Sequence, residues 1–225
     1  MGKLQFTSHI AICDGGGYNI GRLKLEVGMK EREFWKVCKK LNNEERVDVL
    51  RRVMAALDQD GLPVGQISDL VRIEQPSTST YLMQLENDCG LISSKRAGRY
   101  CLYRAEPDHA DEKASRLFAA LKSYFVEETR GFAFINGKRP DRPAFMAVLP
   151  ALANKVRAKV VGILREKGRM DKAALMKATG LGELNVSRHM ACIVECGLSG
   201  IEAGAYVWRE PDDEIARLFI QLSKS

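Results

Sequence analysis

The stretch that decides the fold is QPSTSTYLMQLENDCGLISSKRAGRYCLYRA, residues 75–105. Its first half predicts a helix that begins at Gln75 and ends near Cys89. Pro76 suits the first turn of a helix, and Gly90 suits the left-handed residue that commonly follows the last turn. After the glycine, two short apolar runs, 91–95 and 100–104, surround a turn that contains glycine. They predict a two-stranded hairpin.

Working outward, the residues before this stretch carry apolar side chains at helical spacing. They predict a short amphipathic helix at 31–40, a second helix at 43–57 and a third at 64–71. A closing helix is expected at 111–128, after the hairpin. The expected order is therefore helix, helix, tight turn, helix and hairpin, which is the order of a winged helix-turn-helix domain.

The chain repeats itself, and such a repeat decides the architecture before any single motif does. Three blocks recur in the same order, with one extra residue in the first copy of the second block: LNNEERVDVLRRVM (41–54) and LANKVRAKVVGILR (152–165), STYLMQLENDCGL (79–91) and SRHMACIVECGL (187–198), and AGRYCLYRAEPD (97–108) and AGAYVWREPD (203–212). We interpret the chain as a tandem duplication whose copies have diverged.

The second copy predicts the same elements. They are a helix at 154–167, a helix at 172–179 with Asp171 as N-cap, a helix at 183–196, a shorter hairpin of strands 199–201 and 206–209, and a closing helix at 213–222. The expected fold is mainly α with small β-wings (α+β), in two tandem winged helix-turn-helix domains. Residues 29–130 form domain 1, 131–144 the linker and 145–225 domain 2. Residues 1–28 are either an extension or a β-hairpin.

Composition limits the class of protein. The 225 residues are 45% hydrophobic and 28% charged, as in ordinary soluble proteins. No apolar stretch approaches the roughly 18 residues of a membrane span, and no secretory signal stands at the N-terminus, so we expect a cytoplasmic protein with no membrane partner. The six cysteines include no CxxC pair and are expected to be small buried residues in a reducing compartment.

The charge distribution permits nucleic-acid binding. The net charge is +6, with a pI near 9.0. Lys and Arg balance Asp and Glu over 29–110, so the excess lies after residue 110 and is densest at 155–177. This dense stretch is either a solvated helical face or a basic footprint, and any basic footprint is expected mostly in the second half.

The stretch 75–105 resembles the ArsR/SmtB-like winged-helix regulators, and the resemblance extends over about 30–125 and 145–225. The matching positions in the first copy are Gln75, Ser79, Leu82, Leu85, Gly90, Leu91, Arg96, Gly98 and Tyr103. In the second copy, Ser187–Met190 and Gly197-Leu198 match the helix. The resemblance implies a DNA-binding transcriptional regulator. Members of this family usually act as dimers joined through their first and last helices, so the fused copies imply an intramolecular pseudo-dimer with an asymmetric site.

The resemblance assigns the DNA contacts by position. A recognition helix reads base edges in the major groove, and wing cations reach phosphates. The candidates are Gln75, Ser77, Thr78, Thr80, Tyr81 and Gln84 on the first helix, Lys95, Arg96, Arg99 and Arg104 on the first wing, and Asn185, Ser187, Arg188 and His189 on the second helix. The expected partner is double-stranded DNA. A homodimer is a further possibility, and any small-molecule effector is unidentified.

Two departures from the family leave other functions open. The second wing, 200–205, has a glutamate and no cation, which favours a protein-interaction module without DNA binding. Cys192 and Cys196 lie one helical turn apart, which favours a thiol- or metal-responsive switch, although the family's Cys-x-Cys helix is absent. No metal site or cofactor is assigned. The three histidines are not grouped with a nucleophile, so we expect no enzyme.

Overall fold

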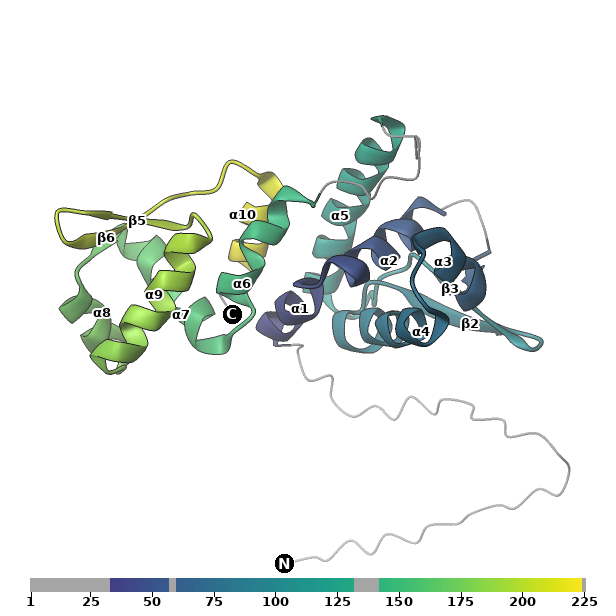
Figure 1. The fold of residues 1–225 in the computed structure, drawn as a ribbon, viewed down its shortest axis with the longest axis horizontal. Helices are drawn as coiled ribbons and strands as arrows, with labels where there is room; N and C mark the ends of the chain where they lie inside the picture. The colour runs from purple at the N-terminus through teal and green to yellow at the C-terminus, as the bar shows by residue number, and fades with distance from the viewer. Residues whose placement is uncertain (1–32, 57–59, 132–141, 224–225) are drawn as a thin grey trace, which may run out of the picture. The chain divides into compact units, whose positions relative to one another are not determined.

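The computed structural model describes residues 33–56, 60–131 and 142–223. Over these ranges the chain is mainly helical with small antiparallel sheets, as the sequence predicts, and residues 31–225 form one compact unit (Figure 1). The expected extension or hairpin at 1–28 and the linker residues 132–141 lie outside the described residues. The proposed domain bounds within 31–225 therefore remain a prediction.

The first copy follows the predicted order with one addition, the two-residue strand β1. Its elements are α1 (Phe34–Leu41), α2 (Glu44–Ala55), β1 (Leu62–Pro63), α3 (Val64–Val71), α4 (Gln75–Gln84), the π-helical turn η1 (Leu85–Cys89), β2 (Ser93–Ala97), β3 (Tyr100–Arg104) and α5 (Glu112–Gly131). The strand β1 pairs with β3, so the antiparallel sheet has the order β1-β3-β2.

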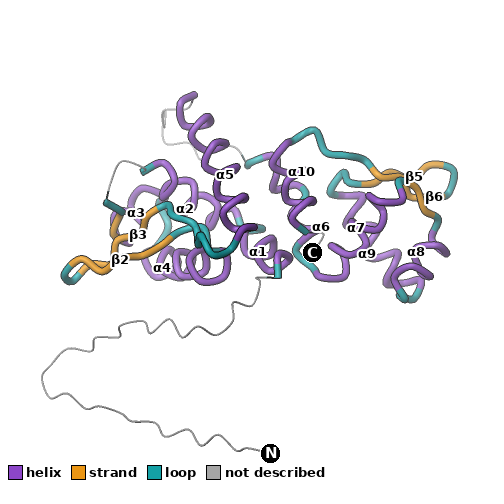
Figure 2. Tube along the Cα trace, turned by 180° about the vertical axis from the view of Figure 1, so that it is seen from behind, coloured by secondary structure: helices purple, strands orange, loops and turns teal. Residues whose placement is uncertain are grey.

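The second copy has the same order of elements. They are the 3-10 turn η2 (Ala144–Ala147), α6 (Leu149–Leu152), α7 (Lys155–Lys167), β4 (Arg169–Met170), α8 (Lys172–Thr179), α9 (Glu183–Glu195), β5 (Ser199–Glu202), β6 (Ala205–Trp208) and α10 (Glu214–Leu222). Its sheet order, β4-β6-β5, matches that of the first copy. Figure 2 shows both hairpins in orange among the helices of their own copies.

Matching asparagines begin the matching helices α2 and α7. The Asn43 Oδ1 atom accepts a hydrogen bond from the Arg46 amide at 2.8 Å. The Asn154 Oδ1 atom accepts from the amides of Val156 and Arg157 at 3.0 and 3.1 Å. Each cap satisfies amides that no helical carbonyl can reach, and is worth about 1 kcal/mol. The pairing of 41–54 with 152–165 therefore holds in structure as well as in sequence.

The repeat also extends upstream of the blocks found in the sequence. Counting back from the matched asparagines, FWKVCKKL (34–41) faces FMAVLPAL (145–152). The shared Phe, Val and Leu positions are buried in both copies. The first segment is one helix, whereas the second contains Pro150 and is divided into η2 and α6. Proline removes a backbone donor and clashes with the preceding turn, which accounts for the division.

The two copies share one hydrophobic core. Helix α1 packs against α6, and α5 packs against α10. At this junction the Phe34 ring of the first copy lies with its centroid 5.8 Å from that of Phe219 in the second copy, and Phe219 stacks on Phe145 of its own copy at 5.5 Å. Phe145 and Phe219 are at most 1% exposed. The junction therefore resembles the interior of a domain more than a contact between two independent surfaces.

The extra residue of the first copy lies in the turn η1. In this turn the Leu91 amide donates to the Leu85 carbonyl, whereas in the second copy the Leu198 amide donates to the Ile193 carbonyl, one residue closer in sequence. A π-helical turn holds one more residue than an α-helical turn. Both helices then end at a left-handed glycine, Gly90 with φ 66° and Gly197 with φ 75°.

Candidate nucleic-acid interface

Among the candidates on α4, those at its start are accessible. Gln75 and Thr80 are exposed, and Ser77 is half-buried. The Thr80 hydroxyl donates to the Pro76 carbonyl at 3.0 Å, within the helix itself. The Gln75 amide is therefore the exposed α4 group best suited to a bidentate contact with a base edge.

Thr78 corrects the sequence prediction. Its side chain is fully buried, and its hydroxyl donates to the Ile73 carbonyl at 3.3 Å. In a helix, residues four and seven positions apart lie on one face, which places Thr78 with the buried Leu82 and Leu85. Its match in α9 is the buried Val186. Thr78 therefore faces the core and cannot reach a DNA groove.

Tyr81 and Gln84 are only half-buried, but both are turned toward the first copy's own fold. The Tyr81 hydroxyl donates to the Glu45 carboxylate at 2.6 Å, and the Arg46 guanidinium lies 5.0 Å from the ring centroid. This bond to Glu45 raises the pKa of Tyr81. The Gln84 Oε1 atom is buried. The sequence reasoning missed Glu45, since no local pattern links residues 36 apart.

The first wing carries three accessible cations. Lys95, Arg96 and Arg99 are exposed, and none of them forms an ion pair with any residue that the structure describes. The Arg96 Nε atom donates to the Gly98 carbonyl at 3.4 Å, and the Arg99 guanidinium lies 5.0 Å from the Tyr100 ring centroid. These contacts leave the positive charges uncompensated at the hairpin turn.

Arg104 differs from the other wing cations because it is paired at the base of the hairpin. It forms a 2.5 Å ion pair with Glu106, and its Nε atom donates to the Ser93 hydroxyl at 3.1 Å. The Ser93 hydroxyl donates in turn to Glu106 at 2.6 Å. The hydrogen bond from Ser93, followed by the charge of Arg104, lowers the pKa of Glu106. Glu106 therefore partly neutralises Arg104, which weakens the attraction of Arg104 for a phosphate.

The helix α9 presents a different chemistry from α4. Asn185 and Arg188 are exposed, whereas Ser187 and His189 are half-buried. Burial, followed by the nearby charge of Arg157, lowers the pKa of His189, so its imidazole is neutral at pH 7. An exposed asparagine and arginine suit adenine and guanine edges respectively. Arg188 is the strongest base-reading candidate in either helix.

The second wing has no cation between Ser199 and Trp208. Its turn residues Ala203 and Gly204 both have positive φ, 47° and 74°, as in the tight hairpin turns that match strand twist. Ile201 on β5 is 63% exposed, and Glu202 lies 4.0 Å from Arg209. This wing therefore offers an apolar surface whose single carboxylate lies beside Arg209, unlike the first wing.

The dense basic stretch 155–177 is largely engaged within the fold. Arg165 pairs with Glu210 at 3.0 Å, and Lys172 pairs with Glu183 at 3.1 Å. Arg157 donates to the Pro150 carbonyl at 3.0 Å. These contacts support the interpretation of this stretch as a helical face. They make the first wing the better candidate for a basic footprint.

The cysteine pair on α9 is poorly suited to oxidant sensing. Burial, followed by the neighbouring Cys192, raises the pKa of Cys196 to about 11. The reactive form of a cysteine is the thiolate, which is scarce at neutral pH when the pKa is so high. In the ranges that the structure covers, no three His, Cys, Asp or Glu side chains are grouped to hold a metal ion.

Comparison of the chain with family models, with curated proteins and with solved structures finds no match. None of the helices within the described ranges is both long and apolar enough to cross a membrane.

Proposed function

We propose that this chain is a cytoplasmic, DNA-binding transcriptional regulator made of two tandem winged helix-turn-helix copies. The observation that carries the proposal is the set of exposed cations Lys95, Arg96 and Arg99 on the hairpin that follows helix α4, which form no ion pair with any residue in the described ranges. Cations at such a turn suit phosphates beside the groove that the helix enters. The proposal assigns the chain no catalytic role.

The junction between the copies supports an intramolecular pseudo-dimer. The first helices, α1 and α6, pack together, as do the last helices, α5 and α10. These are the helices through which ArsR/SmtB-like regulators usually dimerise, and here the Phe34–Phe219 and Phe125–Phe145 ring contacts join the two copies. A covalent partner is present at high effective concentration, so a second chain is not needed to present two recognition helices.

The two copies are expected to contribute unequally to binding. The first copy offers the Gln75 amide and a cationic wing, whereas the second offers Asn185 and Arg188 without a cationic wing. The preferred DNA site should therefore be asymmetric. Its first-copy half would depend more on phosphate contacts and its second-copy half more on base edges.

The test is fluorescence anisotropy of a labelled duplex from the gene's upstream region, with a scrambled duplex as control, over a range of salt concentrations. The wing variant Lys95→Gln/Arg96→Gln/Arg99→Gln is compared with Lys39→Gln/Arg116→Gln/Lys122→Gln, which removes the same charge from α1 and α5. Losing a phosphate contact lowers the slope of log affinity against log salt by about 0.9. The wing variant should lose affinity on both duplexes and flatten this slope, while the control should not.

The second candidate function is a protein-interaction module. It is favoured by two exposed apolar side chains of the second copy, Leu184 at 62% and Ile201 at 63%. Equal, salt-insensitive and weak binding to upstream, scrambled and randomised duplexes would favour this function over DNA regulation. The half-buried, high-pKa thiol of Cys196 does not favour a redox switch.

A further inference from the structure

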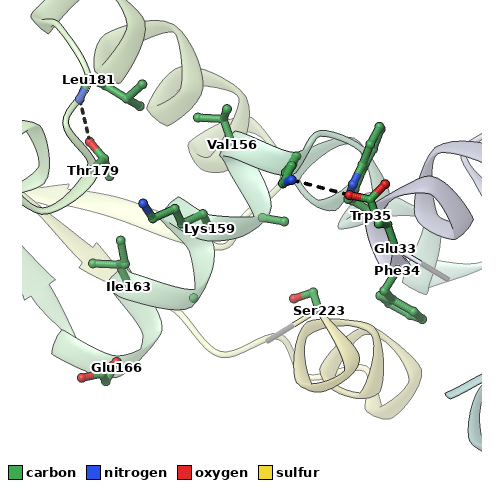
Figure 3. A pocket seen from close by; sticks show the side chains of 13 residues that line it. Glu33, Phe34, Trp35, Val156, Lys159, Ile163, Glu166, Thr179, Leu181 and Ser223 are labelled. Atoms are coloured by element: carbon green, nitrogen blue, oxygen red, sulfur yellow. Dashed lines mark hydrogen bonds and ion pairs between the residues drawn. The ribbon is translucent and has the colours of Figure 1, made fainter. Parts of the chain in front are cut away.

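A cavity of about 730 Å³ lies on the second copy, beside the start of α1. Its lining comes from α7, from the turn between α8 and α9, and from Ser223 after α10 (Figure 3). The apolar side chains of Trp35, Val156, Ile163 and Leu181 are among those that line it. Cavities of this size and character commonly hold small organic ligands.

The cavity exists because the second copy departs from the first at matched positions. In the first copy, α5 packs along α2, and the guanidinium of Arg51 lies 5.4 Å from the Phe125 ring centroid. The α7 residue that matches Arg51, counted from the capping asparagines, is Gly162. A Cβ atom at Gly162 would meet no heavy atom within 4 Å. Glycine in mid-helix thus leaves open the space that an arginine fills in the first copy.

The charges at the cavity are nearly balanced, with one exception. Lys155 pairs with Glu33 at 3.5 Å, and Glu166 pairs with Lys167 at 3.2 Å. The Lys159 ammonium group forms no ion pair with any residue in the described ranges. In Figure 3 the Lys159 side chain extends past Val156 and Ile163 toward Thr179. The cavity therefore combines apolar walls with one uncompensated positive charge.

We propose that this cavity binds a small organic anion with an aromatic or otherwise flat apolar body. The body would lie against Trp35, Val156 and Ile163, and its carboxylate or sulfonate would pair with Lys159. A neutral ligand would leave Lys159 without a partner, and a cation would be repelled by it. Charge complementarity therefore selects an anion among the apolar molecules that the cavity could hold.

The position of the cavity suggests what the ligand does. Thr179 ends α8, Leu181 belongs to the turn that leads into α9, and Trp35 belongs to α1 of the other copy. A bound anion would contact both the entry to a recognition helix and the junction between the copies. This regulatory role rests on the proposed function, whereas binding of the anion does not.

The probe is anilinonaphthalene sulfonate, and N-phenylnaphthylamine is the neutral match that lacks only the sulfonate. The full chain contains two tryptophans, so Trp208→Phe leaves Trp35, in the cavity wall, as the sole energy donor. We expect saturable energy transfer from Trp35 to the sulfonate probe. Lys159→Gln should weaken binding of this probe about fivefold, the effect of a good partly exposed ion pair, and should not change binding of the neutral probe.

Two further variants complete the experiment. Gly162→Leu fills the cavity and should abolish saturable binding of both probes, with its folding checked by circular dichroism and urea unfolding. Lys177→Gln removes a charge of α8 outside the cavity and should not change the binding of either probe. The proposal is overturned if Trp35 gives no saturable transfer, or if Lys159→Gln affects the two probes equally. If Gly162→Leu fails to fold, the comparison of the two probes in Lys159→Gln still tests the proposal. Failure to bind DNA would leave these titrations unchanged.

Discussion

The hydroxyl of Tyr81 on α4 is held 2.6 Å from the carboxylate of Glu45 on α2, in the same copy. The ring also lies 5.0 Å from the Arg46 guanidinium, so two side chains of α2 hold the tyrosine in place. A tyrosine held in this way supports the packing of α4 on α2. It is not free to turn toward a base.

Replacing Tyr81 with Phe should therefore change DNA affinity by less than about twofold and stability by about 1 kcal/mol or less. Arg188→Ala, at an exposed position of α9, should instead cost about 1–3 kcal/mol of discrimination between the upstream and scrambled duplexes. Anisotropy titrations of both variants at one salt concentration make the comparison. A loss of discrimination in Tyr81→Phe equal to that in Arg188→Ala would show that Tyr81 reads DNA.

His189 gives a pH dependence of stability with a definite sign. Its pKa is lowered in the folded chain, by burial first and by Arg157 second, so the unfolded chain binds this proton more readily. Stability is then fully retained above the ordinary histidine pKa of about 6.5 and declines as pH falls through it. Urea unfolding at about pH 8 and about pH 6 should show a smaller decline in His189→Gln than in the parent chain. An equal decline in both would contradict this assignment.

The shared core predicts that the two copies unfold together. Trp35 lies in the first copy and Trp208 in the second, so the single-tryptophan variants Trp35→Phe and Trp208→Phe report on different copies. Tryptophan fluorescence in urea should give coincident transitions for the two reporters. Phe219→Ala should lower the free energy of unfolding by about 3–5 kcal/mol and shift both reporters equally, because this fully buried ring contacts Phe34 and Phe145. Two separate transitions in the parent chain would mean that the copies are independent domains.

The cysteines should differ sharply in reactivity. Cys101 is exposed, Cys38 and Cys89 are buried, and the pKa of Cys196 is about 11. With a pKa near 11, about one Cys196 thiol in a thousand is ionised at pH 8. Ellman's reagent should therefore react fastest with Cys101, in a Cys13→Ser background because Cys13 lies outside the described residues. Cys101→Ser should remove the fast phase and Cys196→Ser should leave it. If Cys196→Ser removed the fast phase and Cys101→Ser left it, the result would favour a thiol-responsive switch.

Elements whose ends are marked by residues that start or stop a helix were predicted closely. The helices α3 and α8 begin and end at the predicted residues, because Pro63 and Asp171 precede them and Gly180 follows α8. The strands β1 and β4 were not predicted, since two residues cannot show an alternating pattern. The turn and helix at 144–152 were also missed, because Pro143 just before them and Pro150 within them resemble a linker and part of their burial comes from the other copy.

The candidate site was predicted less well than the fold. Position in a helix indicates which residues share a face, but not which face meets the core, so Thr78 was placed on the wrong side. The hydrogen bonds of Ser93 to Arg104 and Glu106 depend on the strand register, which places Ser93 opposite Arg104. The cavity beside Lys159 has no signature in either copy alone. It becomes visible only when Arg51 and Gly162 are compared as matched positions in the same structural setting.

The π-helical turn at 85–89 has a consequence for how the two copies could diverge. An inserted residue in a regular helix rotates everything beyond it by about 100° around the axis. Here the insertion is confined to one turn, since Leu91 and Leu198 are both buried immediately after a left-handed glycine. The hairpin is thus insulated from changes in the length of the preceding helix. The exposed surface at the start of α4 or α9 and the hairpin that follows it can change separately over evolution, without either losing its place in the fold.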